Sequence, residues 1–117
     1  MKKKIRAIIK RPEDEIGVIT EIDNKLHEFQ KIVGGYIETV TLMDEEPQVV
    51  IICNEEGRLL DLPYNCTING VDFAGPIIAV GIEDDDFGDL PSAITAVRWN
   101  EDFLELINGQ ATEVKEA

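Results

Sequence analysis

The chain has 117 residues, a formal net charge of −13 and a hydrophobic share of 44%. This length predicts one domain, and this apolar share excludes a disordered chain. No apolar run approaches the roughly 20 residues of a membrane span, and the apolar segment after the N-terminal lysines is too short for a signal peptide. We therefore expect a cytoplasmic protein that does not associate with membranes.

The charges are distributed unevenly along the chain. Six of the eleven basic residues lie in the first eleven positions, and a strongly acidic body follows. Such a body repels phosphate backbones, so direct binding to nucleic acid is disfavoured. The acidic surface suits solubility, and it also suits a basic protein partner.

The first 22 residues are expected to form a β-hairpin. Residues 3–10 place Ile5, Ala7 and Ile9 on one face and basic side chains on the other, as in a half-buried strand. Residues 12–15 form a polar turn, and residues 16–22 alternate again as the second strand.

A helix, a glycine pair and a strand follow directly. Leu26, Phe29 and Val33 share one face of a helix over residues 24–33, which Asp23 or Asn24 would cap. Gly34 and Gly35 are expected to end the helix in a left-handed turn and to let the chain fold back as a strand over residues 36–43.

The middle of the chain contains two strands that are apolar without alternation, residues 48–53 and 76–82, as expected where a sheet is covered on both faces. Gly81 in the second of these marks a bulge or a close backbone approach. Residues 54–57 are expected to turn, residues 58–62 to form a short return strand, and residues 63–70 to be irregular.

The last third is expected to hold an acidic loop at residues 83–89 and one helix over residues 91–108, with a frayed tail at 110–117. The alternative is that Asn100 caps a separate helix over residues 101–108. The predicted fold class is thus α+β: an antiparallel or mixed β-sheet with two helices packed on it, in a single domain of residues 1–109. A homodimer is one way to cover the two apolar strands.

Several short segments occur in a characteristic order: Val33-Gly34-Gly35-Tyr36-Ile37-Glu38, Cys53-Asn54-Glu55-Glu56-Gly57, Leu62-Pro63 with Asn65, and Ala74-Gly75-Pro76 running to Val80-Gly81. In this order they resemble a family of short proteins from phages, plasmids and Firmicutes genomes, known only as a domain of unknown function. The resemblance covers about residues 3–90, and residues 91–109 are less like the family. It implies a mobile-element setting and brings no catalytic residues.

Catalytic residue types are scarce. His27 is the single histidine and Ser92 the single serine, which disfavours a serine triad or a cysteine–histidine pair. Cys53 and Cys66 have no metal-site spacing and are expected to be buried free thiols. We expect no cofactor and no metal.

Glu38 lies on the apolar face of the strand predicted at 36–43. Such a carboxylate sits at a strand end or edge, pairs with a cation, has a raised pKa, or contacts a ligand. The candidate contact residues for a ligand or partner are Tyr36, Glu38, Asn54, Glu56, Arg58 and Asn65.

The sequence favours a non-enzymatic binding protein of a phage or other mobile element, acting in counter-defence. It would occupy a host or phage protein as an acidic mimic of DNA, or sequester a small nucleotide-like ligand, with Tyr36 stacking on the base and Arg58 meeting phosphate. The alternatives are a small enzyme that uses Glu38 or Glu56 as its base, and a purely structural interaction protein.

Overall fold

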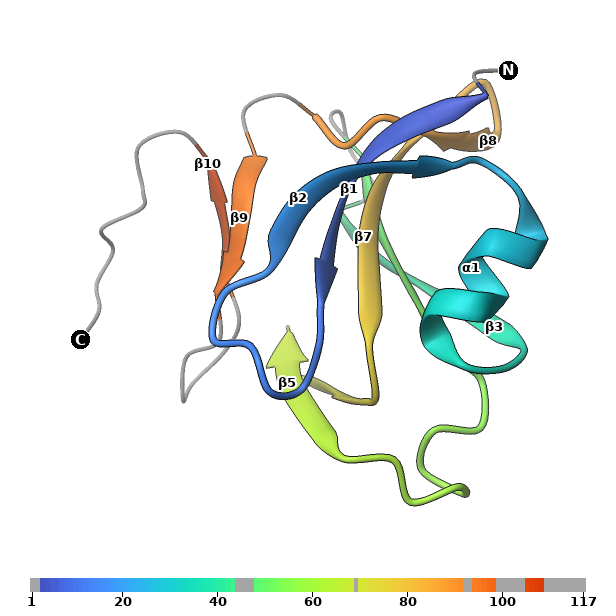
Figure 1. Cartoon of the computed structure of the whole chain (residues 1–117). Coiled ribbons are helices and arrows are strands. Elements are labelled where there is room, and N and C mark those ends of the chain that lie inside the picture. The colour runs from blue at the N-terminus through green and yellow to red at the C-terminus, as the bar shows by residue number, and fades with distance from the viewer. Residues whose placement is uncertain (1–2, 44–47, 69, 92–93, 99–104, 109–117) are drawn as a thin grey trace.

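A six-stranded antiparallel sheet forms the centre of the molecule (Figure 1). The computed structural model describes residues 3–43, 48–68, 70–91, 94–98 and 105–108. The helix and strands within these residues are β1 Lys4–Lys10, β2 Val18–Asp23, α1 Leu26–Val33, β3 Ile37–Met43, β4 Val49–Asn54, β5 Tyr64–Ile68, β6 Val71–Ala74, β7 Ile77–Glu83, β8 Asp86–Gly88, β9 Ile94–Arg98 and β10 Glu105–Asn108.

The strand order of this sheet is β2-β1-β7-β4-β3, with β8 paired to β7. The predicted hairpin is confirmed, because β1 and β2 pair antiparallel with Lys4 opposite Asp23 and Ile9 opposite Val18. The two central strands β4 and β7 pair with each other, with Val50 opposite Val80. Their uninterrupted apolar sequence therefore matches the place where a strand is covered on both faces.

Each face of the sheet covers its own apolar core. On one face α1 packs Phe29 and Val33 against alternate residues of β1, β4 and β7. On the other face the β5–β6 hairpin contributes Cys66, Ile68 and Phe73 to a second cluster. The arrangement is thus helix, sheet and hairpin in three layers, which is why β1 is buried on both faces from Ala7 onward rather than half-buried as predicted.

Helix α1 ends as expected and begins differently. Gly34 adopts a φ of +84° at the C-terminal cap, and its amide donates to the Gln30 carbonyl at 2.8 Å. The N-terminal cap is Lys25, without a side-chain hydrogen bond. The prediction of Asp23 or Asn24 as cap is wrong because both are engaged elsewhere: Asp23 pairs with Lys4 at 2.9 Å, and Asn24 donates to the Phe87 carbonyl.

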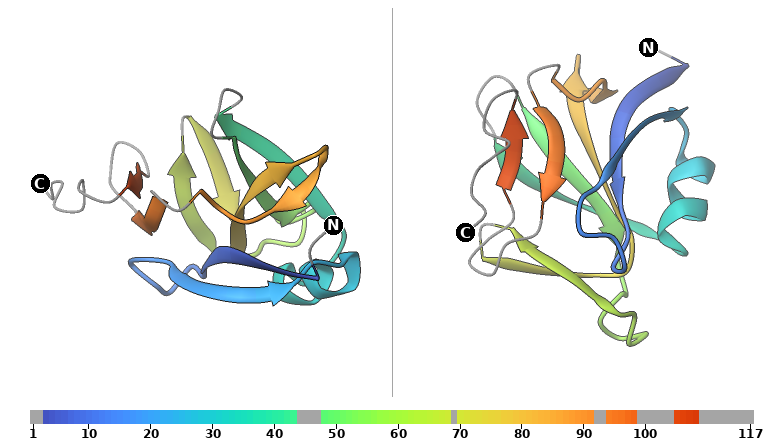
Figure 2. Two further views of the ribbon diagram at one scale, coloured as in Figure 1. Left: turned by 90° about the horizontal axis from the view of Figure 1, so that it is seen from above. Right: turned by 60° about the vertical axis from the view of Figure 1, so that its left-hand side comes forward.

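The predicted α+β class with two packed helices is wrong, because the described residues form a mainly antiparallel β-structure with a single helix of eight residues. The helix expected over 91–108 is replaced by β9 and β10, which pair antiparallel beside β1 and β2, on the side of the molecule away from α1 (Figures 1 and 2). Apolar residues spaced by three and four in a short segment rich in β-branched residues do not separate helix from strand. Residues 99–104 and the predicted tail at 110–117 lie outside the described residues.

The connections were also misassigned in part. The short return strand predicted at 58–62 is a continuous turn over residues 55–61, and the irregular stretch predicted at 63–70 contains β5. The acidic loop predicted at 83–89 contains β8, which closes a tight hairpin with positive φ at Asp84 and Asp85. For β5 and β8, pairing with a neighbouring strand decided a structure that local turn residues do not specify.

Candidate functional site

The end of α1, the end of β4 and the turn that follows β4 meet at one place, and the Asn54 side chain joins them. Asn54 is 6% exposed, and its amide nitrogen donates to the Val33 carbonyl at 3.1 Å. Its amide oxygen accepts from the Glu56 backbone amide at 2.7 Å. One buried side chain thus satisfies a helix-terminal carbonyl and fixes the start of the turn.

Both glycines after α1 are explained by this junction. Gly34 takes the left-handed conformation that costs least in glycine. A Cβ on Gly35 would lie 3.0 Å from the Asn54 amide nitrogen, so Gly35 permits the close approach of the two chain segments. The glycine pair is therefore structural here, as its position after a helix and before a strand predicts.

This junction carries an open pocket of about 280 Å³. Two of its lining residues are large apolar side chains that are well exposed, Tyr36 at 69% and Leu60 at 54%, and Leu59, which precedes Leu60 in the chain, is 83% exposed. We call Tyr36, Leu59 and Leu60 the Tyr36–Leu60 patch. The residues that line the pocket are Gln30, Gly34, Gly35, Tyr36, Asn54, Glu56 and Leu60.

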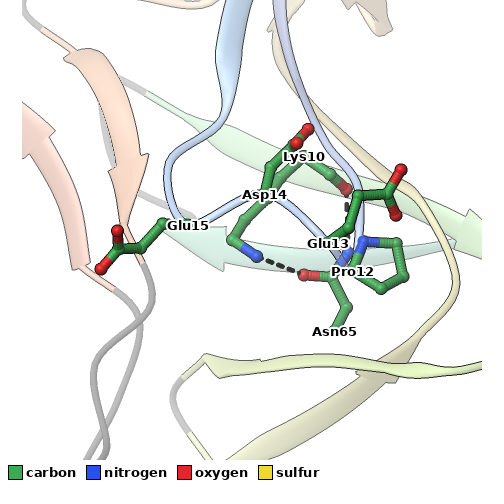
Figure 3. Close-up of a pocket in the computed structure, with 6 residues that line it drawn as sticks. All are labelled: Lys10, Pro12, Glu13, Asp14, Glu15 and Asn65. Atoms are coloured by element: carbon green, nitrogen blue, oxygen red, sulfur yellow. Dashed lines mark hydrogen bonds between the residues drawn. The ribbon is translucent and has the colours of Figure 1, made fainter.

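A second pocket, of about 250 Å³, lies between the β1–β2 turn and β5 (Figure 3). Its lining residues are Lys10, Pro12, Glu13, Asp14, Glu15 and Asn65.

Lys10 is 1% exposed, and its ammonium donates to the Asn65 amide oxygen at 2.7 Å. The Asn65 amide nitrogen donates to the carbonyls of Lys10 and Gly75, each at 2.8 Å. Burial lowers the pKa of Lys10, while Cys66, Asp14 and Glu13 act against that shift. The polar groups of Asn65 are thus engaged in holding β1, β5 and the chain at Gly75 together.

Of the six predicted contact residues, the structure brings Tyr36, Asn54 and Glu56 to one pocket. Asn65 lies in the other pocket. Glu38 is exposed on β3, an outer strand of the sheet, which matches the expectation that it sits at an edge. Arg58 is exposed in the turn over 55–61 and does not line the pocket.

Sequence reasoning missed Lys10, Gln30 and the two leucines of the turn. Leu59 and Leu60 were assigned to a strand, although consecutive apolar residues between Arg58 and Asp61 in a turn must expose at least one side chain. The burial of Lys10 could not be predicted from its sequence position, because a lysine at the end of a strand is ordinarily exposed to solvent. Its burial depends on Asn65, which lies 55 residues further along the chain.

The predicted free thiols are found: Cys53 and Cys66 are buried and unpaired with each other. Burial raises the pKa of each thiol to about 11, with Glu38 adding to the shift at Cys53 and Lys10 opposing it at Cys66. Such thiols are poor nucleophiles at neutral pH. Within the described residues, no three His, Cys, Asp or Glu side chains gather closely enough to hold a metal ion.

The described part of the chain contains no helix that is long and apolar enough to cross a membrane. Searches among curated proteins and among solved structures found no significant match. Residues 5–104 match the family described as "Domain of unknown function (DUF3846)". Because this match extends over most of the chain, the protein belongs to the DUF3846 family.

Proposed function

We propose that this is a non-enzymatic binding protein that occupies a protein partner through the Tyr36–Leu60 patch. The observation that carries the proposal is the exposure of three large apolar side chains on a small acidic protein, of which Tyr36 and Leu60 line an open pocket and Leu59 precedes Leu60 in the chain. Clustered apolar exposure of this kind marks interaction surfaces, whereas single exposed apolar residues are ordinary.

The pocket lining favours a protein side chain over a nucleotide. Its members supply aromatic, amide and carboxylate groups, and none of them is cationic. A phosphate would meet Glu56 there, since Arg58 lies outside the lining. An apolar side chain in the pocket with a Lys or Arg beside Glu56 is the complementary arrangement.

The acidic surface does not favour a mimic of DNA. Exposed carboxylates of the described residues are spread over the molecule and include Glu13 and Glu15 on the β1–β2 turn, Glu38 on β3, Asp72 on β6, and Asp84 and Asp85 on the β7–β8 turn. The antiparallel pairing of β1 with β7 puts the β1–β2 and β7–β8 turns at opposite ends of the sheet. We propose instead that the charge accelerates encounter with a basic partner. The resemblance to phage and plasmid proteins supports a mobile-element setting, in which the partner would be a component of host defence.

The enzyme alternative has one supporting observation, because Glu56 lies in a pocket beside Asn54. Both polar ends of the Asn54 amide, however, already bond to the backbone. Glu56 is exposed, without the burial that tunes a carboxylate for acid–base work. We therefore propose that Glu56 contacts the partner. Turnover of a substrate that Glu56→Gln abolishes would contradict this.

A matched pair of variants tests the proposal. Leu60 and Leu26 are 54% and 55% exposed, and Leu26 lies at the opposite end of α1 from the patch. Tagged wild-type protein, Leu60→Asp and Leu26→Asp are incubated with host lysate, and a captured protein is then purified and its affinity measured by calorimetry.

We expect wild type and Leu26→Asp to bind with equal affinity and Leu60→Asp to bind at least about tenfold more weakly, because a buried charge replaces an apolar anchor. Binding should weaken as salt rises, since screening removes the attraction between opposite charges. Equal binding by Leu60→Asp would show that the patch is not the contact surface.

A further inference from the structure

The outer edge of β3 is open. Strand β3 pairs with β4 on one side, and no other strand within the described residues pairs with it on the other side. β2, the strand at the opposite end of the sheet, carries Glu21 and Asp23 and has β9 close by. β3 carries one charged residue, Glu38, and neither lysine nor proline, and its register with β4 is unbroken from Ile37 to Thr41, shifting only between Thr41 and Met43. Edge strands without such residues are templates for pairing with another chain.

The hydrogen bonds of the ladder show which backbone groups of β3 face outward. The Glu55 amide donates to the Tyr36 carbonyl at 2.8 Å, so residue 36 bonds toward β4. Bonding direction alternates along an antiparallel strand, so Glu38 and Val40 also bond toward β4. The amides and carbonyls of Ile37, Thr39 and Thr41 therefore point away from the sheet.

We propose that a second copy of this chain pairs antiparallel with this edge, continuing the sheet across a two-fold axis at Val40. This register places Thr39 opposite Thr41 of the partner subunit, so that the outward amides and carbonyls of both copies bond to one another. Glu38 then lies opposite Leu42 of the partner subunit, and no carboxylate of β3 faces its own copy.

The space along this edge suits a second strand. Thr39 and Thr41 are exposed on the face that α1 covers further in, so the helix does not reach over the edge. Val40 and Leu42 are partly buried against the other core, and a neighbouring copy would extend that apolar cover. The two-fold axis is perpendicular to the sheet, which puts both α1 helices on the same face. This inference does not depend on the Tyr36–Leu60 patch.

The test removes one outward amide without touching a bond to β4. Thr39→Pro removes the backbone amide hydrogen of residue 39. Thr39→Ala, the control, shortens the side chain but retains that amide hydrogen. Molecular mass is measured by light scattering across a concentration series, and exchange of the β3 amides is followed by NMR.

We expect wild type, Thr39→Ala and Leu60→Asp to form dimers, and the dissociation constant of Thr39→Pro to rise at least about tenfold, because each dimer loses two hydrogen bonds. Dimerisation should strengthen as salt rises, because like charges are screened; binding at the patch should respond in the opposite direction.

The exchange data decide the matter if Thr39→Pro does not fold. In the dimer the amides of Thr39 and Thr41 exchange slowly in wild type, as those of Glu38 and Val40 do. A monomer at every concentration, a dimer indifferent to Thr39→Pro, or fast exchange at the amides of Thr39 and Thr41 would overturn the proposal. Capture of a different protein's strand at this edge, with the chain itself monomeric, would overturn it as well.

Discussion

At the scale of single residues, two buried amides carry much of the organisation. Asn54 joins the end of α1 to the turn after β4, and Asn65 joins β1 to β5 and to Gly75. Both asparagines are at most 6% exposed. Sequence reasoning selected both as candidate ligand contacts, because an asparagine in a turn-rich segment has the same signature whether its amide bonds to backbone or to a ligand.

Replacing Asn65 by alanine should lower the free energy of unfolding by about 2–4 kcal/mol, because it leaves the Lys10 ammonium without this acceptor and two buried carbonyls without this donor. Urea unfolding measures the loss. The double variant Asn65→Ala with Lys10→Met should lose less free energy of unfolding than the sum of the losses in the two single variants. Strict additivity would show that the two side chains do not cooperate.

The thiols predict an alkaline loss of stability. The pKa of Cys66 is about 11 in the folded protein against an ordinary value of 9.0. Above pH 9 the unfolded chain therefore loses this proton before the folded protein does. The stability that the neutral thiol provides is present below pH 9 and is lost as the pH rises to about 11, on the order of 2 kcal/mol.

In Cys66→Ala, the free energy of unfolding measured at several pH values should lack the part of the alkaline decline that the Cys66 thiol causes.

Lys10 changes the pH dependence of stability in the opposite direction. Its pKa is lowered in the folded protein, so the cost of burying the ammonium disappears as the pH rises through that lowered value toward 10.5. A pH profile of Cys66→Ala that is identical in slope to wild type would contradict the assignment.

At the scale of elements, β7 depends on one glycine. A Cβ on Gly81 would collide with the Asp89 carbonyl, at the point where the chain returns past β8 toward Leu90. Asp89 in turn accepts the Arg6 amide at 2.8 Å. Of the two alternatives predicted for Gly81, a bulge or a close backbone approach, the structure has the close backbone approach.

Gly81→Ala should therefore destabilise the protein by about 3 kcal/mol or more, since a backbone oxygen must move and β1 moves with it. Gly70 provides the control. It has a φ of +82°, and a Cβ there meets nothing within 4 Å, so Gly70→Ala should cost only about 1–2 kcal/mol of backbone strain. Thermal unfolding of the two variants compares them, and equal losses would contradict the packing argument.

At the scale of the whole molecule, the net charge of −13 opposes the compact state through repulsion among carboxylates. The ion pairs of Lys4 with Asp23 and of Lys31 with Glu28 lie in positions that solvent reaches, so they offset this repulsion little. The apolar clusters on the two faces of the sheet must therefore supply most of the stability.

The melting temperature should rise by several degrees when salt increases from about 10 mM to about 150 mM, because the screening length falls from about 30 Å to about 8 Å. Calorimetry at fixed pH checks this. Replacing the pair Asp84 and Asp85 by asparagine should reduce the dependence on salt while keeping the positive φ that both positions adopt. A melting temperature independent of salt would show that repulsion is unimportant.

The sequence by itself determined the elements whose signal is local and strong. The β1–β2 hairpin, α1 with its glycine end, β3, and the doubly covered strands β4 and β7 follow from periodicity, β-branched content and glycine conformation. It also named Tyr36 and Asn54 as candidate contact residues, and both line the pocket at the end of α1.

Tertiary structure decided the rest, because the deciding contacts join residues far apart in the chain. The segments at 94–98 and 105–108 are strands because they pair with each other, and β5 is a strand because it pairs with β6. Lys10 is buried because Asn65 reaches it across 55 positions. Pairing and burial of this kind depend on the assembled sheet, and a local window of sequence does not contain the partner that fixes them.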